Sequence, residues 1–280
     1  MDPSVFMAVI AAAAMHAGWN AILKIRLDPF LAVVLVNAAC GIIALPAALY
    51  IGVPELHVWP WIGSSILIHL FYYLTLSGAY RLADMGLVYP IARGSAPLMT
   101  TVLSVVLIGE AVSLQGFLGV VLLALGILAI AWRRAGVAAL DGTALKLALA
   151  CGVSITAYTL VDGLGARATG NPHQYSAWLF VMDSVLITLF ALVWKGPRAL
   201  KPTLGFIGPG FAGGAMSLTA YWISIWAMTK APIGLVAAVR ESSVLFGAVI
   251  AVVVLREPLK PNRIVAAILI VAGLVLIKLH

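Results

Sequence analysis

Two arginines lie inside long apolar segments, where a charged side chain is costly. Arg93 lies in the segment GLVYPIARGSAPLMTTVL, and Arg240 lies in GLVAAVRESSVLFGAVI. A central arginine in a membrane helix costs at least about 2.5–3.5 kcal/mol on insertion scales, so each must face a water-filled cavity or an anionic partner. Two interpretations stay open. Either arginine could bind an anionic group such as a carboxylate, for which the guanidinium fork is suited, or form an internal ion pair with Glu241 or Asp183.

Asp183 and Glu241 are the acids that we place well inside the apolar segments. Burial disfavours the charged form of a carboxyl group, so either acid could bind and release a proton. The alternative is a structural contact between helices. Glu241 directly follows Arg240, and adjacent residues on a continuous helix do not face each other. At least one of these two is therefore expected to find its partner elsewhere.

Other polar side chains recur every four residues in apolar segments. His16 and Asn20 share a helix face with Trp19 beside them, and a later segment repeats the spacing with Ser154, Tyr158 and Asp162. Residues four apart share a helix face, and a polar stripe on an apolar helix faces the protein interior. His16 and His69 alone do not make a metal site, since neither a third histidine nor a cysteine accompanies them.

Aromatic side chains are concentrated in two further segments, IHLFYYLTLSGAY and TAYWISIWAM. His69 and Tyr73 share one face of the first, while Tyr221 and Trp222 lie in the second. They could form apolar walls with polar handles around an amphipathic solute, or they could pack between helices. Ser95 is similarly ambiguous between cavity lining and helix packing.

The composition identifies the environment of these residues. Of the 280 residues, 63% are hydrophobic and only 10% are charged, and the mean hydropathy is +1.11. Soluble proteins carry about 25% charged residues, so we predict an all-α integral membrane protein. The net charge of +7 comes from residues in short loops, where they act as topology signals rather than a nucleic-acid surface. Cys40 and Cys151 are interpreted as small buried hydrophobic residues.

Ten segments are long enough to span a membrane as helices, which takes about 20 residues each. Their expected ranges are 5–23, 30–50, 59–78, 85–108, 113–132, 143–161, 174–194, 203–228, 232–255 and 261–279. The first five form a unit at 1–132, and the last five form a unit at 143–280. The segment between them, 133–142, is rich in turn residues and is predicted to be a cytoplasmic linker.

The two units repeat one design. The stretch from Gly86 to Ile130 returns from Gly234 to Ile277, and the alignment pairs Arg93 with Arg240, Ser95 with Ser242, Glu110 with Glu257, and Gly126 with Gly273. Each unit holds an odd number of helices, so the second copy must lie upside down relative to the first. Inverted repeats are common in secondary transporters, whose binding site lies near the membrane midplane between the repeats.

The lysines and arginines predict the orientation. Outside the two buried arginines, twelve fall in loops on one side and three on the other; the three are Arg167, Lys230 and Lys278. Because cytoplasmic loops carry the excess of positive charge, the side with twelve is predicted to be cytoplasmic. Both termini are then on the non-cytoplasmic side of the cell (inner) membrane.

These features together resemble a known family. The chain resembles the drug/metabolite transporter superfamily, specifically its ten-helix EamA-type members, over nearly its whole length. The motifs are the segment with Pro97, the acid-bearing turns IGEAVSLQGFLG and LREPLKPNRIVA, and the glycine-bearing last helix of each unit. The second copy departs from the first at Leu245, which stands where the first has Pro97. Within the family, the overall similarity is greatest to YddG-type amino-acid exporters.

The resemblance implies export of small metabolites through a cavity lined by helices 1–4 and 6–9. We expect an exporter of amino acids with aromatic or other apolar bodies, working by alternating access, with a broad-range drug or metabolite efflux carrier as the alternative. An intramembrane enzyme is a distant alternative, since neither a nucleophile motif, an aspartate-rich motif nor HExxH occurs. No cofactor or metal is expected, a monomer suffices, and the partners are the small-molecule substrate and the lipid bilayer. The predicted substrate-binding residues are His16, Trp19, Asn20, His69, Tyr73, Arg93, Ser95, Tyr158, Tyr221, Trp222 and Arg240, with Asp183 and Glu241 as proton or ion-pair candidates.

Overall fold

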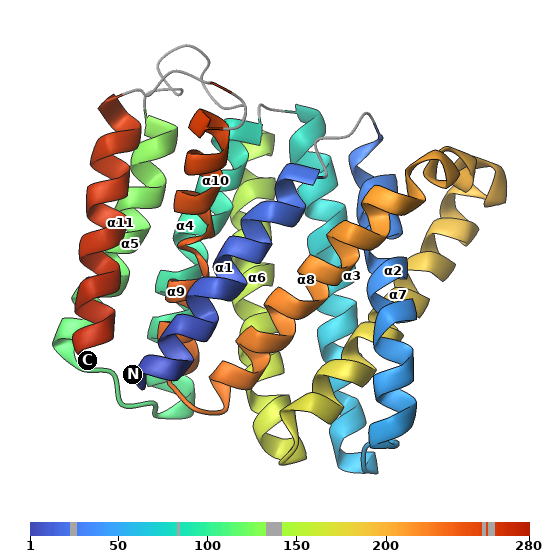
Figure 1. Cartoon of the computed structure of the whole chain (residues 1–280), viewed down its shortest axis with the longest axis horizontal. Coiled ribbons are helices and arrows are strands. Elements are labelled where there is room, and N and C mark those ends of the chain that lie inside the picture. Colours follow the sequence, from blue (N-terminus) through green and yellow to red (C-terminus); the bar gives the residue numbers. More distant parts are fainter. Residues whose placement is uncertain (23–26, 83–84, 133–141, 254–255, 257–260) are drawn as a thin grey trace.

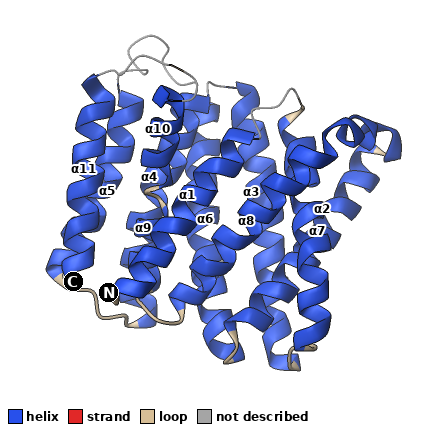
Figure 2. Ribbon diagram, in the orientation of Figure 1, coloured by secondary structure: helices blue, strands red, loops and turns tan. Residues whose placement is uncertain are grey.

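A computed structural model describes the chain except for residues 23–26, 83–84, 133–141, 254–255 and 257–260. The described residues form helices joined by short turns, and no strand occurs among them (Figure 2). The helices are α1 (Pro3–Ile22), α2 (Pro29–Ile51), α3 (Trp59–Leu82), α4 (Met85–Leu103), α5 (Leu114–Trp132), α6 (Gly142–Thr169), α7 (Pro172–Lys195), α8 (Ile207–Met228), α9 (Ile233–Arg240), α10 (Ser243–Val253) and α11 (Pro261–Leu279).

Membrane-spanning segments dominate the described structure. Eight helical segments within it are long and apolar enough to cross a membrane, judged by length and composition, with α9 and α10 counted as one. The helices α5 and α8 do not meet this criterion. The ten membrane spans that the sequence predicts are therefore not confirmed. The protein is a multi-pass membrane protein.

The starts of α2 and α7 follow from the same local sequence. Asp28 precedes Pro29, and its carboxylate accepts hydrogen bonds from the backbone N–H groups of Phe30 and Leu31 at 3.0 and 3.2 Å. Asn171 precedes Pro172 and caps α7 in the same way. A short polar cap followed by proline at the first helical position satisfies the free N–H groups of a helix start.

The apolar pattern predicts one continuous helix over 232–255, and this prediction is wrong. The structure has two helices there, α9 and α10. The chain leaves α-helical geometry at Glu241 and Ser242, where the backbone N–H of Ser242 bonds to the carbonyl of Val239 at 3.0 Å and that of Val244 bonds to Glu241 at 3.1 Å. Bonds between residues three apart tighten the turn relative to an α-helix. The break needs no proline, and it brings the Arg240 and Glu241 side chains within contact distance of each other.

The helices pack mainly across the two halves of the chain. In Figure 1, α5 and α11 lie together at one side of the bundle and α2 and α7 at the other, while α3 packs on α6 and α1 on α8 between them. The α5–α11 contact is close because it is made at glycines: a Cβ at Gly119 would lie 2.7 Å from the carbonyl oxygen of Gly273. Both termini lie at the same end of the bundle, and Lys278 Nζ is 3.5 Å from the Met1 carbonyl oxygen.

Candidate functional site: a charged cavity between the two halves

A cavity lies among helices from both halves of the chain. Its empty space is about 840 Å³, which includes a part that is open to solvent. Side chains from α1–α4 and α6–α9 line it, and α5 and α11 contribute none. The lining residues are His16, Trp19, Val33, Val36, Asn37, His69, Tyr72, Tyr73, Leu76, Arg93, Tyr158, Leu179, Phe180, Asp183, Ser217, Ala220, Tyr221 and Arg240.

Arg93 forms an ion pair that joins the halves. Its Nη1 lies 2.8 Å from Oε1 of Glu241, and the exposed fractions of the two side chains are only 5% and 1%. The pair connects α4 to the turn between α9 and α10. Removing one partner of such a pair leaves an uncompensated buried charge and typically costs about 3–5 kcal/mol. The geometry therefore gives Arg93 the internal ion pair that was one of its two interpretations.

Arg240 has a weaker set of contacts. Its Nη2 lies 3.5 Å from the Glu241 carboxylate oxygen that Arg93 already binds, and its guanidinium lies 5.2 Å from the Tyr221 ring centroid. Its Nε–H has no acceptor among the described residues, although the side chain is buried. A buried guanidinium with an unsatisfied donor facing a cavity has the chemistry of an anion site.

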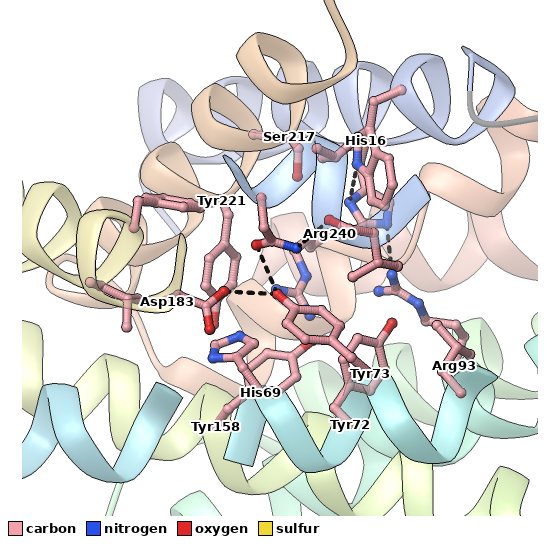
Figure 3. Close-up of a pocket in the computed structure, with 18 residues that line it drawn as sticks. His16, His69, Tyr72, Tyr73, Arg93, Tyr158, Asp183, Ser217, Tyr221 and Arg240 are labelled. Atoms are coloured by element: carbon pink, nitrogen blue, oxygen red, sulfur yellow. Dashed lines mark hydrogen bonds between the residues drawn. The ribbon is translucent and has the colours of Figure 1, made fainter. Parts of the chain in front are cut away.

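His16 lies beside Arg93 at the same side of the cavity (Figure 3). Arg93 Nη2 is 2.7 Å from His16 Nε2, and Trp19 Nε1 is 3.2 Å from His16 Nδ1. Both neighbours are donors, whereas a neutral imidazole accepts through one nitrogen only. The shorter, charge-assisted contact assigns Nε2 as the acceptor for Arg93. Trp19 then serves mainly as an apolar wall, with its ring edge-on to His16.

The opposite side of the cavity carries an acid (Figure 3). The hydroxyl of Tyr73 donates to Oδ2 of Asp183 at 2.9 Å and lies 3.1 Å from Oδ1 of Asn37. Oδ1 of Asp183 is buried and has no donor among the described residues. A group that enters the cavity could satisfy this oxygen once the side chains that cover it move aside.

Aromatic rings complete the wall between these two ends. The His69 ring stacks on Tyr158 with centroids 4.2 Å apart, and Tyr221 meets both rings edge-on. Tyr72 packs edge-on against Tyr158 from α3. The site thus combines one partly unsatisfied arginine, one partly unsatisfied aspartate and an aromatic surface.

Most of the predicted site residues meet at this cavity, and four do not line it. Asn20 turns back to bond the His16 carbonyl at 2.7 Å, and Ser95 bonds the Ile91 carbonyl at 2.8 Å. Trp222 donates to His173 at an exposed site, at 2.9 Å. Glu241 lies behind the lining in its contacts with the two arginines. The role of the others in binding a substrate stays a prediction.

Sequence reasoning missed Asp162 as a buried acid. The expected helix ended at residue 161, whereas α6 continues to Thr169, and Asp162 is fully buried within it. Its oxygens accept hydrogen bonds from the hydroxyls of Tyr175 and Tyr221. The signal was present, since Ser154, Tyr158 and Asp162 share one helix face, but the helix end was placed too early.

Glu110, in the acid-bearing turn of the first unit, connects separate helices. Its carboxylate pairs with Arg167 from α6 and accepts the backbone N–H of Ile233 at 2.8 Å, at the start of α9. Arg167 also donates through Nε to the Met228 carbonyl at 2.9 Å. These bonds join the α4–α5 connection to α6 and to the α8–α9 turn.

Comparisons with known proteins agree with this architecture. Residues 142–279 match the EamA-like transporter family. No curated protein matches the chain. A solved crystal structure of a protein aligns over 100% of this chain and 98% of its own, with a TM-score of 0.77 and 18% identity, which shows the same fold. The similarity to YddG-type exporters stays a prediction. The protein is thus a multi-pass membrane protein whose C-terminal half matches the EamA-like transporter family, and this match indicates a membrane transporter of small molecules rather than an enzyme.

Proposed function

We propose that the protein is a secondary transporter that exports amino acids with aromatic or other apolar bodies across the inner membrane by alternating access. The observation that carries this proposal is the pairing of two unsatisfied charged groups in one cavity. Arg240 and Asp183 both line the cavity, and the Nε–H of Arg240 and Oδ1 of Asp183 are buried without a hydrogen-bond partner among the described residues. A zwitterion can satisfy both, with its carboxylate at Arg240 and its ammonium group at Asp183. The aromatic wall then contacts its apolar body.

Two inverted five-helix repeats, at 1–132 and 143–280 with the linker 133–142, account for the packing of the helices. The contact of α3 with α6 is matched by that of α8 with α1, while α2–α7 and α5–α11 pair equivalent helices. The N-caps Asp28 and Asn171 start equivalent helices in the same way. These matches support the two-fold relation that alternating access between repeats requires.

The position of part of the lining supports an inward-facing state. In α1 and α2, the lining residues lie in the last two turns of α1 and the first turns of α2, away from the end where the termini lie. At the end with the termini, Glu110 joins Arg167 and Ile233 across the halves. With the termini outside the cell, this arrangement is an inward-facing state that the Glu110 contacts hold closed on the outer side.

Replacing Glu110 with Gln should weaken this outer closure. The variant loses a charge-assisted hydrogen bond, which is worth about 1.5–3 kcal/mol, so outer access should rise roughly tenfold. The measurement is the labelling rate of a Ser217→Cys reporter in the cavity by an impermeant maleimide added outside, with Cys40 and Cys151 replaced by Ala. Glu55→Gln is the control, because Glu55 is an exposed acid. Equal labelling rates in both variants would contradict the assignment of this closure.

Counterflow of labelled amino acids in proteoliposomes tests the proposed function. The panel contains an aromatic, a branched and a basic amino acid together with one lipophilic cation. We expect saturable counterflow of the aromatic and branched amino acids, because only they match both charged groups and the apolar wall. Flux that does not saturate or is not stimulated by substrate on the other side would indicate a channel and overturn the proposal.

A broad-range efflux carrier is the alternative. It would bind lipophilic cations at an available acid, and Glu241 was the candidate. Both arginines contact one oxygen of the Glu241 carboxylate, and Glu241 does not line the cavity. Transport of the cation alone in the panel would favour this alternative, with Asp183 as its acid.

A further inference from the structure

Asp162 is a buried acid that the proposed substrate site does not use. It lies in α6 one turn beyond Tyr158, which lines the cavity, and its exposed fraction is 0%. Tyr175 donates to Oδ1 at 2.9 Å, and Tyr221 donates to Oδ2. Tyr221 also lines the cavity, so its hydroxyl separates the cavity from the acid. A substrate ammonium group therefore has no direct access to Asp162.

Among the described residues Asp162 has no cationic partner, which it shares with Asp183 but not with Glu241 or Glu110. None of the ion pairs among the described residues includes it, whereas Glu241 has Arg93 at 2.8 Å and Glu110 has Arg167. The ionisable groups that face it are Tyr175 and Tyr221, which donate to it, and Asp183, which is near enough to repel its charge. His69 and Arg240 contact the ring of Tyr221. An acid at this depth in a membrane helix is costly when it is charged and unpaired.

The location of Asp162 connects the cavity to the closed end of the bundle. Tyr158 lies one turn before it, and Arg167 lies five residues after it, which is about 7.5 Å along a helix. Arg167 makes the contacts with Glu110 and the α8–α9 turn, and α6 ends at the side where the termini lie (Figure 1). An outward opening that separates α6 from α8 would expose Asp162 to that side and break its bond from Tyr221.

We propose that Asp162 is the binding site of a proton that is exchanged for the substrate. This proposal rests on the proposed transport function and adds its energy source. In the outward-open state a proton from the outer side binds the Asp162 carboxylate and neutralises it. After the change of state, the proton passes to the cavity and the inner side by way of the Tyr221 hydroxyl, which lines the cavity, and the carboxylate again accepts hydrogen bonds from Tyr175 and Tyr221. One proton enters for each substrate that leaves, and Tyr221 links the proton site to Arg240.

The experiment measures protons and substrate together. Proteoliposomes containing a pH-sensitive dye receive labelled phenylalanine, and the ratio of protons to substrate moved is determined for the wild type, Asp162→Asn and Asp183→Asn. We expect about one proton for each substrate in the wild type. Asp162→Asn should retain counterflow within about twofold, since exchange of substrate for substrate needs no net proton movement, but its ratio should fall to nearly zero. Asp183→Asn should lower the flux and leave the ratio unchanged.

The outcomes separate this proposal from the proposed function. Net substrate flux without proton movement in the wild type would overturn the role of Asp162 alone, as would unchanged proton movement in Asp162→Asn. An absence of wild-type counterflow would overturn the transport function and this proposal with it. If Asp162→Asn does not fold, Tyr175→Phe provides the test. It removes one donor that stabilises the charged carboxylate, so half-maximal proton-driven transport should move to higher pH; an unchanged pH profile would overturn the proposal.

Discussion

Replacing Arg240 with Gln should reduce amino-acid counterflow by about 30-fold or more. The variant keeps a polar side chain of similar shape but removes the charge that we assign to the substrate carboxylate. Loss of one partner of a buried charge pair costs about 2–5 kcal/mol, and each 1.4 kcal/mol is a factor of about ten in affinity. The counterflow of Arg240→Lys should be intermediate between that of the wild type and that of Arg240→Gln, because lysine keeps the charge and loses the guanidinium fork. The measurement is the concentration dependence of counterflow in proteoliposomes.

Two comparisons make the Arg240 result specific. Arg198→Gln is the matched control, since Arg198 is exposed and lies far along the chain from the cavity lining. It should transport like the wild type. Wild-type counterflow in Arg240→Gln would contradict the assignment and would leave Arg240 as a residue that only packs on Tyr221.

Replacing Arg93 with Met should instead destabilise the fold. It leaves the Glu241 carboxylate buried without its 2.8 Å partner, and breaking a buried pair in this way costs about 3–5 kcal/mol. Glu241→Met should cost a similar amount. The double variant Arg93→Met/Glu241→Met removes both charges, so it should be more stable than either single variant. The loss of stability of each of the three variants relative to the wild type is measured by thermal unfolding of the purified protein in detergent.

Additive losses in that double-mutant cycle would contradict a coupled pair, because independent sites add and contacting sites do not. Together with the transport measurements, the cycle distinguishes the role of Arg93 from that of Arg240. The first arginine is expected to act mainly on stability, and the second mainly on transport. The sequence places both at equivalent positions, but in the structure Arg93 lies 2.8 Å from the Glu241 carboxylate oxygen and Arg240 lies 3.5 Å from the same oxygen.

Much of the site could be read from residue types in apolar segments. Arg93, Arg240 and Asp183 stand out because charge is rare and costly within the membrane, and the tyrosines and His69 share faces by simple helical spacing. The pairing of Arg93 with Glu241 was one of two open interpretations. Sequence could not decide between them, since the choice depends on how α4 lies against the break after α9.

Other features depend on local geometry that spacing does not reveal. The turn at Glu241 and Ser242 interrupts a segment whose apolar pattern is continuous, and Leu245 in place of proline offered no signal for it. Asp162 was placed on an interior-facing stripe but not among the deeply buried acids, because helix ends are hard to place within several residues and it lies one residue past the predicted end. The helix faces of Asn20 and Trp222 were predicted as polar or aromatic, but their side chains find nearer partners outside the cavity lining.

The most direct test of the central claim compares inhibitors that differ only at the carboxylate. Wild-type counterflow of labelled phenylalanine is measured against unlabelled phenylalanine, phenylalanine amide and phenethylamine. If Arg240 binds the substrate carboxylate, phenylalanine should inhibit at least about 30-fold more strongly than the two compounds that lack this group. Equal inhibition by all three would show that the cavity recognises the aromatic body and the amine alone, and it would contradict the account of Arg240.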